Sequence, residues 1–197
     1  RVFEFEQISH LLEEKTHQTV LEVNLNAVTH NLNVYKQMLG PTVKLMAMVK
    51  AFSYGSGSFE IANLLQFHHV DYLAVAYTDE GVELRKAGIT LPIMVMNAEE
   101  VNFDMLVAYN LEPELFFLGI LNNFEAYLKQ AGITHFPVHL KLDTGMHRLG
   151  FEEKDIDALC NALVATQVFK VQSAFSDLAT RDSARHDDFT KAQATSF

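Results

Sequence analysis

The sequence has little cysteine, no tryptophan and fewer positive than negative charges. Its single cysteine, Cys160, cannot form an internal disulfide, so nothing calls for an oxidising compartment and we expect a cytoplasmic protein. Fifteen Lys and Arg against 25 Asp and Glu give a net charge of -10, which argues against nucleic acid or an anionic membrane as the main partner. Because Cys160 lies on an apolar helical pattern, we expect it to pack as a small core residue.

Long apolar runs are also absent. The longest, residues 45–49 and 72–77, are far shorter than the roughly 18 to 20 residues that cross a bilayer, so we expect no membrane span. The first residues lack an initiator Met and the layout of a signal peptide. We therefore expect Arg1 to be a cut end or an interior position of a longer chain.

The sequence does contain a regular alternation of short apolar runs and helical patterns. The apolar runs predict strands covered on both faces, at residues 20–25, 43–49, 72–76, 93–96, 114–117, 138–142 and 168–175. Apolar residues three and four apart predict helices at residues 26–38, 59–67, 79–87, 101–109, 122–130 and 154–165. Repeated strand–helix–strand units predict parallel pairing, because each crossover returns the chain to the same end of the sheet.

Two α/β architectures agree with this alternation, a (β/α)8 TIM-type barrel and an open doubly wound sheet. A complete barrel needs eight strands and about 250 residues, so a barrel chain of this length would stop after about six βα units. No glycine-rich dinucleotide fingerprint follows the first core strand, which weakens the open-sheet alternative. We therefore expect an incomplete barrel over residues 20–197, preceded by a lead-in or linker over residues 1–19.

Lys50 lies at the carboxyl end of the apolar run 43–49, where barrel enzymes place catalytic groups. Partial burial there disfavours the ammonium form, so more neutral amine is available to attack a carbonyl or an aldehyde cofactor. The turn with Gly55 and Gly57 lets the backbone approach a ligand and can present amides to a phosphate. The ordinary alternative is a lysine that extends from a strand end into solvent.

A second motif, residues 139–151, follows another predicted strand. It reads His-Leu-Lys-Leu-Asp-Thr-Gly-Met-His-Arg-Leu-Gly-Phe and places Lys141, Asp143 and Arg148 within eight positions. Taken alone, this motif is typical of a surface ion-pair cluster at a strand end. Elsewhere, His68 and His69 are adjacent and have no spaced carboxylate or cysteine partners, so we expect no metal site.

Together, the two motifs resemble the alanine racemase family. Residues 49–57 are similar to its cofactor-lysine motif, with Val-Lys-Ala followed by Tyr-Gly and a further Gly. Residues 141–150 are similar to its Lys-x-Asp-Thr-Gly-Met-x-Arg-Leu-Gly signature. Weaker agreements at residues 72–89 and 92–97 lie between them, in the order of the family.

The resemblance implies a fold-type III barrel that binds pyridoxal 5'-phosphate (PLP), followed by a mostly β C-terminal domain. It implies a homodimer that interconverts L- and D-alanine in the cytoplasm for peptidoglycan synthesis. Lys50 would bind PLP covalently and act as the base on one face of the substrate, while Tyr54 would hold the PLP phosphate. Lys141 matches a lysine that is often carbamylated, and Arg148 matches an arginine near the substrate carboxylate. A carbamate on Lys141 would relieve the repulsion between these two cations.

The chain also departs from the family. Asp177 takes the cofactor-binding position where a histidine normally lies against the pyridine ring, and so replaces an aromatic ring with a negative charge. The C-terminal domain would come after Phe197, and the tyrosine base for the opposite substrate face would come from the partner's copy of that domain. We therefore expect the 197-residue chain alone to be weakly active or inactive. Residues 3–18 resemble the junction in fusions with UDP-N-acetylmuramoyl-tripeptide:D-alanyl-D-alanine ligase.

Two other functions agree with the same residues. The first is another fold-type III PLP protein, either an amino-acid decarboxylase or a PLP carrier. An assay that compares CO2 release with D-alanine formation distinguishes it from a racemase. The second is a noncatalytic barrel module within a cell-wall enzyme, in which Asp177 marks a decayed site.

Overall fold

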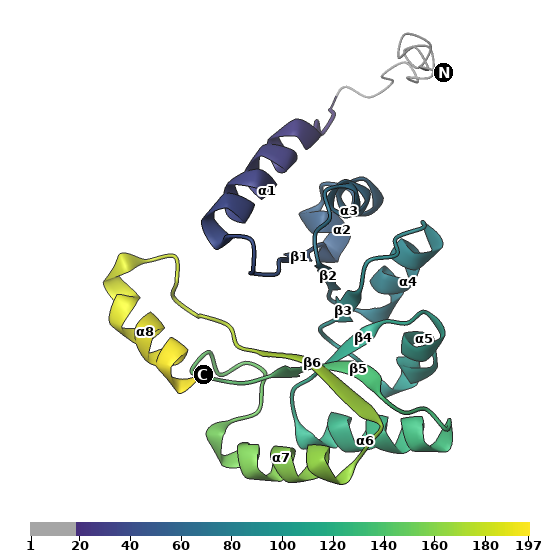
Figure 1. The fold of residues 1–197 in the computed structure, drawn as a ribbon. Helices are drawn as coiled ribbons and strands as arrows, with labels where there is room; N and C mark the ends of the chain where they lie inside the picture. The colour runs from purple at the N-terminus through teal and green to yellow at the C-terminus, as the bar shows by residue number, and fades with distance from the viewer. Residues whose placement is uncertain (1–18) are drawn as a thin grey trace.

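A computed structural model describes residues 19–197, and its centre is one parallel sheet of six strands (Figure 1). The strands are β1 (Met46–Met48), β2 (Tyr72–Val75), β3 (Ile93–Val95), β4 (Glu112–Leu115), β5 (Phe136–Lys141) and β6 (Phe169–Phe175). Each strand pairs in parallel with the next one along the chain. Because a doubly wound sheet reverses its strand order at a switch point, this unbroken order confirms the incomplete barrel.

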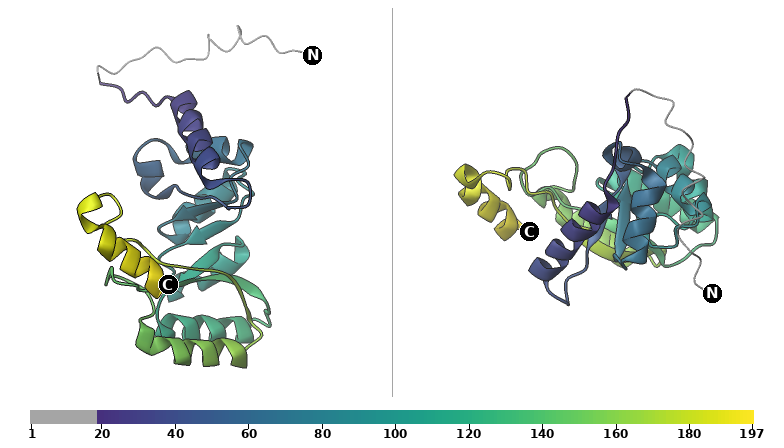
Figure 2. Two further views of the ribbon diagram at one scale, coloured as in Figure 1. Left: turned by 60° about the vertical axis from the view of Figure 1, so that its left-hand side comes forward. Right: turned by 90° about the horizontal axis from the view of Figure 1, so that it is seen from above.

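Helices connect the strands. They are α1 (Leu25–Leu39), α2 (Lys50–Tyr54), α3 (Ser58–Phe67), α4 (Thr78–Lys86), α5 (Phe103–Ala108), α6 (Leu118–Gln130), α7 (Ile156–Ala165) and α8 (Asp187–Ser196). Short 3-10 turns precede α5, α7 and α8, at Glu100–Asn102, Glu153–Asp155 and Ala184–His186. Helices α3 to α7 form an arc along one side of the sheet, whereas α8 lies on the other side (Figures 1 and 2).

The core lies between the sheet and this arc of helices. Helix α6 is an example of a helix with one apolar face. Its residues Ile120, Phe124 and Leu128 are spaced four apart, and all three are buried. The ring of Phe124 meets the edge of the Phe136 ring on β5, with 5.5 Å between centroids. Such a contact fixes the helix against the strand that carries Lys141 at its end.

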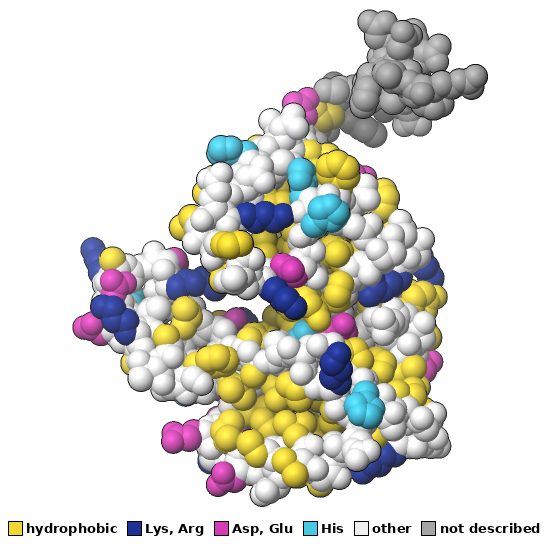
Figure 3. All heavy atoms as spheres, viewed as in Figure 1, with side chains coloured by type: hydrophobic (Ala, Val, Ile, Leu, Met, Phe, Trp, Pro, Cys, Tyr) yellow, Lys and Arg dark blue, Asp and Glu magenta, His cyan; other side chains and the backbone are white. Residues whose placement is uncertain are grey.

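The sheet is less covered toward β6. Val171 on β6 is 42% exposed, and hydrophobic side chains gather over the lower half of Figure 3, where β6 and α7 lie. Within the described part of the chain, β1 and β6 each have a single neighbouring strand. The barrel segment therefore has two unpaired edges, which invite a further strand or another surface to cover them.

Two expectations about the elements are wrong. Residues 20–25 form no strand; instead, the side chain of Asn24 accepts a hydrogen bond from the Ala27 amide and starts helix α1. Cys160 is exposed rather than part of the core, because α7 buries Leu159 and turns the next residue outward. The six other predicted strands are present, with boundaries shifted by a few residues.

Two further sequence expectations concern the N-terminus and the membrane. The ligase-type junction at residues 3–18 and all but the last residue of the predicted lead-in 1–19 lie outside the described residues. Over residues 19–197, no helix has both the length and the apolar character that a membrane crossing requires.

Candidate active site

The candidate site begins directly after β1, with an unusual turn. Residues 51–54, none of them glycine, have φ between 50° and 59°, so α2 is a turn of left-handed helix that follows Lys50. An L-residue in this conformation brings its Cβ close to the following carbonyl oxygen, at a cost of roughly 1–2 kcal/mol per residue. Backbone strain of this kind persists only where the surroundings hold it, and it clusters at functional sites.

The carboxylate of Glu80 on α4 holds this turn. Its Oε1 accepts a hydrogen bond from the amide of Ala51 at 2.7 Å. Its Oε2 accepts two more, from the amides of Ala76 at 2.7 Å and Tyr77 at 3.1 Å. One carboxylate therefore ties the chain just after Lys50 to the carboxyl end of β2, which fixes where the lysine backbone lies.

Lys50, Tyr54, Arg148 and Asp177 line one pocket of about 390 Å³ at the carboxyl end of the sheet. The remaining lining residues are Met48, Met96, Met146, Leu178, Ala179, Arg181 and Asp182. Lys50 is half-buried, and Tyr54 is 67% exposed. Four of the five predicted site residues thus come together from three segments of the chain, in a volume suited to a small molecule.

A larger hollow of about 650 Å³ lies elsewhere, lined in part by residues 40–45 and by His69. These residues precede β1 and β2, so the hollow lies at the amino-terminal end of the strands. Barrel enzymes place their active sites at the opposite end, and the hollow contains none of the predicted site residues. The smaller pocket around Lys50 is therefore the candidate active site.

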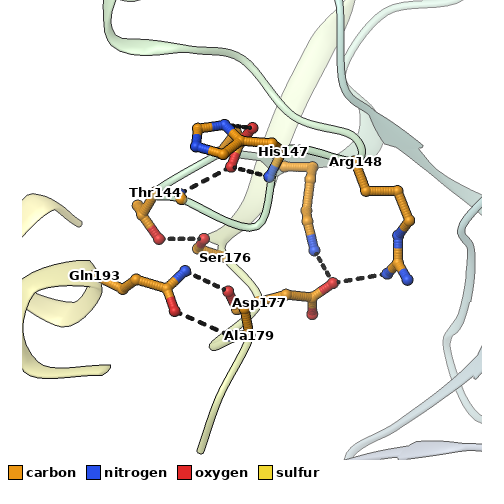
Figure 4. Close-up of polar contacts among 10 residues, drawn as sticks. Thr144, His147, Arg148, Ser176, Asp177, Ala179 and Gln193 are labelled. Atoms are coloured by element: carbon orange, nitrogen blue, oxygen red, sulfur yellow. Dashed lines mark hydrogen bonds and ion pairs between the residues drawn. The ribbon is translucent and has the colours of Figure 1, made fainter. Parts of the chain in front are cut away.

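Lys141, the fifth predicted residue, ends β5 and is buried behind the pocket. Its Nζ lies 2.7 Å from Oδ2 of Asp177, and the same oxygen accepts a hydrogen bond from Nη2 of Arg148 at 3.0 Å (Figure 4). The contact between Lys141 and Asp177 is an ion pair, but its angles do not meet those of a hydrogen bond. On another side, Nζ lies 4.7 Å from the centre of the Phe175 ring, a cation–π contact.

A second carboxyl group, Glu114 on β4, lies near this cluster and is only 1% exposed. Burial raises the pKa of Glu114 to about 7; the positive charge of Lys141 lowers it, Asp177 raises it and Arg148 lowers it. Its Oε2 has no hydrogen-bond partner among the described residues. Glu114 is therefore partly protonated near neutral pH, unlike an ordinary surface glutamate.

The loop that carries Arg148 is held by Asp143 and Gly150. Oδ1 of Asp143 accepts hydrogen bonds from the amides of Gly145 at 2.9 Å and His147 at 3.0 Å. Burial raises the pKa of Asp143, but these bonds and the nearby His147 ring outweigh it and hold the pKa below its usual range. Gly150 has φ +133°, and a Cβ there would lie 2.6 Å from the Asp143 nitrogen, so only glycine closes the loop.

Helix α8 fixes the backbone around Asp177. The buried side chain of Gln193 accepts a hydrogen bond from the Ala179 amide at 2.9 Å and donates one to the carbonyl of Asp177 at 3.1 Å (Figure 4). Next to it, the hydroxyls of Thr144 and Ser176 lie 2.7 Å apart. The carboxylate of Asp177 therefore projects from a backbone that two other segments hold in place.

Sequence reasoning missed three of these residues. Glu80 gave half of a signal, because a glutamate at the third position of a helix can accept from the N-cap amide, although Tyr77 is not the Ser or Thr that completes a capping box. Glu114 and Gln193 gave no signal, since each is a polar residue whose importance comes from burial against distant segments. Among residues 19–197, no three His, Cys, Asp or Glu side chains gather closely enough to hold a metal ion.

The donor set agrees with PLP. Lys50 offers a primary amine to the aldehyde, the exposed Tyr54 hydroxyl suits a phosphate, and the pocket has room for a small ligand. The amides of residues 55–57 already donate to backbone carbonyls of the turn. The incomplete parallel barrel and the lysine in its pocket agree with the class of PLP-binding barrels. A model of the family described as alanine racemase, N-terminal domain, matches residues 23–197. The chain belongs to this family, whose members are PLP-dependent.

Curated relatives and solved structures agree with the family. The chain is 35% identical over 188 residues to an amino-acid racemase of Enterococcus faecalis, covering 92% of this chain and 25% of the relative. It is 36% identical over 166 residues to an alanine racemase of Synechocystis sp., covering 82% and 44%. The solved alanine racemase of Clostridium difficile 630 superposes with a TM-score of 0.82 at 31% identity, covering 90% of this chain and 48% of that one. The chain thus spans about half or less of the length of these relatives.

Proposed function

We propose that this chain is the cofactor-binding part of an alanine racemase that interconverts L- and D-alanine with PLP held on Lys50. The observation that carries the proposal is the position of Lys50 at the carboxyl end of β1, in the same pocket as Tyr54 and Arg148. Membership of the alanine racemase family and the names of the relatives support it.

Each pocket residue has a chemical task in this proposal. PLP, when bound, withdraws electrons from the substrate Cα and makes its proton acidic. The Lys50 amine removes or returns that proton on one face of the substrate. The Tyr54 hydroxyl binds the phosphate, and the Arg148 guanidinium attracts the substrate carboxylate.

The surrounding contacts hold the backbone segments that carry these groups. Glu80 and the left-handed turn hold the Lys50 backbone at the mouth of the barrel, which limits how far the amine can move. The loop closed by Gly150 presents Arg148 to the same pocket from another segment of the chain. A barrel that holds its groups on different segments can therefore keep amine and guanidinium apart while both reach one small molecule.

Racemisation needs a proton donor and an acceptor on opposite faces of Cα. We propose that the second group comes from the C-terminal domain of a partner subunit, so that the active protein is a homodimer. We further propose that it works in the cytoplasm and supplies D-alanine for peptidoglycan. In this proposal, residues 19–197 provide only one of the two faces.

The test is a trapping experiment. PLP is added to the purified protein, borohydride is used to fix it, and the peptides are identified by mass spectrometry. We expect the pyridoxyl mass on Lys50, no such adduct in Lys50→Ala, and an unchanged adduct in the control Lys44→Ala, since Lys44 is an exposed lysine outside the pocket. Labelling elsewhere, with none on Lys50, would contradict the proposal.

A second assay separates the reactions. L-alanine is incubated with the intact protein, and D-alanine is measured with a D-specific oxidase while released CO2 is collected. D-alanine without CO2 is the expected result. CO2 release without D-alanine would instead support the amino-acid decarboxylase, and neither product from a protein that carries PLP on Lys50 would support a carrier or an inactive module.

A further inference from the structure

One carboxylate oxygen joins two cations at the back of the candidate pocket. Oδ2 of Asp177 lies 2.7 Å from Lys141 Nζ and 3.0 Å from Arg148 Nη2. The Lys141 side chain is almost wholly buried, Asp177 is about one third exposed, and Arg148 lines the pocket. The negative charge that these two cations need is therefore already supplied by a side chain of this chain.

We propose that Asp177 is the anion that positions Arg148 in the pocket, and that Lys141 remains an unmodified ammonium group that holds Asp177. The proposal rests on the proposed function, because it gives Arg148 a substrate to orient. Asp177 acts through Arg148 and is a positioning residue rather than a catalytic one. The proposal also replaces the expectation that a carbamate on Lys141 separates the two cations.

The surroundings of Lys141 favour a positive charge on Nζ. On one side lies the Asp177 carboxylate and on another the face of the Phe175 ring, and both attract a cation. Glu114 is a second acidic group near the same amine. Asp177 already places one negative charge between the two cations, so a carbamate on Lys141 would put a second anion at the same point.

A carbamate would work against both contacts. Its formation releases protons from the ammonium, after which the Nζ lone pair bonds to the carbon of CO2 and one C=O pair moves onto oxygen: R–NH3⁺ and CO2 give R–NHCOO⁻ and two H⁺. The product would carry its negative charge beside Asp177 Oδ2, where like charges repel. It would also lose the attraction to the Phe175 ring.

Asp177 is also well placed to hold another side chain. Gln193 bonds the carbonyl of Asp177 and the amide of Ala179, which prevents the backbone from turning the carboxylate away. Arg148 itself is more than half exposed, and among the described residues its guanidinium makes no ion pair other than the one with Asp177. Without Asp177, no ion pair within residues 19–197 would fix the direction of this guanidinium.

The first experiment is made on the unchanged protein, and a variant serves only as its blank. The intact protein is equilibrated with 13C-bicarbonate, and its carbamate resonances are recorded by NMR, with Lys141→Arg as the blank. We expect no resonance that depends on Lys141. A Lys141-dependent carbamate signal in the unchanged protein would overturn the proposal, and the result is independent of whether the protein racemises alanine.

The second experiment tests the positioning role by a double-mutant cycle on the intact, PLP-loaded protein. Asp177→Asn should lower kcat/KM for alanine by about tenfold or more, chiefly through KM, whereas in an Arg148→Ala background it should have less than about a threefold effect. Asp177→Glu should restore part of the loss, and the exposed Asp157→Asn on α7 is the control.

An equal loss from Asp177→Asn in both backgrounds would show that Asp177 acts independently of Arg148, and would overturn the positioning role. Failure of the proposed function looks different: PLP would then be absent from Lys50 in the trapping experiment. The cycle is interpreted only for variants of which a separate sample yields the trapped adduct, while the carbamate measurement stands without it.

Discussion

Replacing Glu114 with glutamine tests the energetics of the buried cluster. Its pKa is about 7 in the folded protein, against an ordinary value of 4.5, mainly because it is buried. The folded state then holds the proton more tightly than the unfolded state, so the free energy of unfolding falls as pH rises from about 4.5 to about 7 and is level above. At about 1.4 kcal/mol per pH unit, the loss over this window is about 3 kcal/mol.

Glu114→Gln removes the charge and keeps the shape, so it should abolish this loss. We expect the variant to unfold with a free energy within about 1 kcal/mol of the unchanged protein at pH 5, and to be more stable by up to about 3 kcal/mol at pH 8. Lys141 and Arg148 attract the ionised Glu114 carboxylate but not a neutral glutamine, so this attraction makes the gain in stability at pH 8 smaller.

The assay is urea unfolding followed by circular dichroism at pH 5, 6, 7 and 8. The slope m should stay constant, so that the shift in midpoint measures the change in stability. Glu83→Gln, which changes an exposed glutamate on α4, is the control and should shift the midpoint little at any pH. A difference between Glu114→Gln and the unchanged protein that is the same at all four pH values would refute the reasoning.

Three more predictions concern the backbone of the site. Glu80→Ala leaves three amides without their acceptor, so we expect about 2–4 kcal/mol of lost stability in urea unfolding and less PLP adduct after borohydride. Gly150→Ala forces a Cβ against the loop backbone, so thermal unfolding should show at least about 2 kcal/mol of destabilisation, and KM for alanine should rise as Arg148 shifts; an unchanged KM would contradict this. Ala51→Gly relieves a left-handed residue and should be neutral or stabilise by up to about 1 kcal/mol, whereas Ala126→Gly in the right-handed α6 should cost about 1 kcal/mol.

Local patterns in the sequence were enough to predict most of the fold. The six strands of the sheet follow apolar runs, and the parallel order follows from the helices between them. Lys50 could be placed at a strand end because the strand immediately precedes it in the chain. The prediction failed at residues 20–25, whose apolar residues look like a strand but find no neighbouring strand to pair with, while Asn24 begins a helix.

The tertiary structure alone decided how the site is held and charged. No local preference predicts a left-handed turn after Lys50; it depends on Glu80, which comes from the next βα unit. Likewise, burial of Glu114 and the bridge from Asp177 to Lys141 depend on β4, β5 and β6 lying side by side. Apolar periodicity reports on residues a few positions apart, whereas the pairing of charges depends on distances that only the packed chain determines.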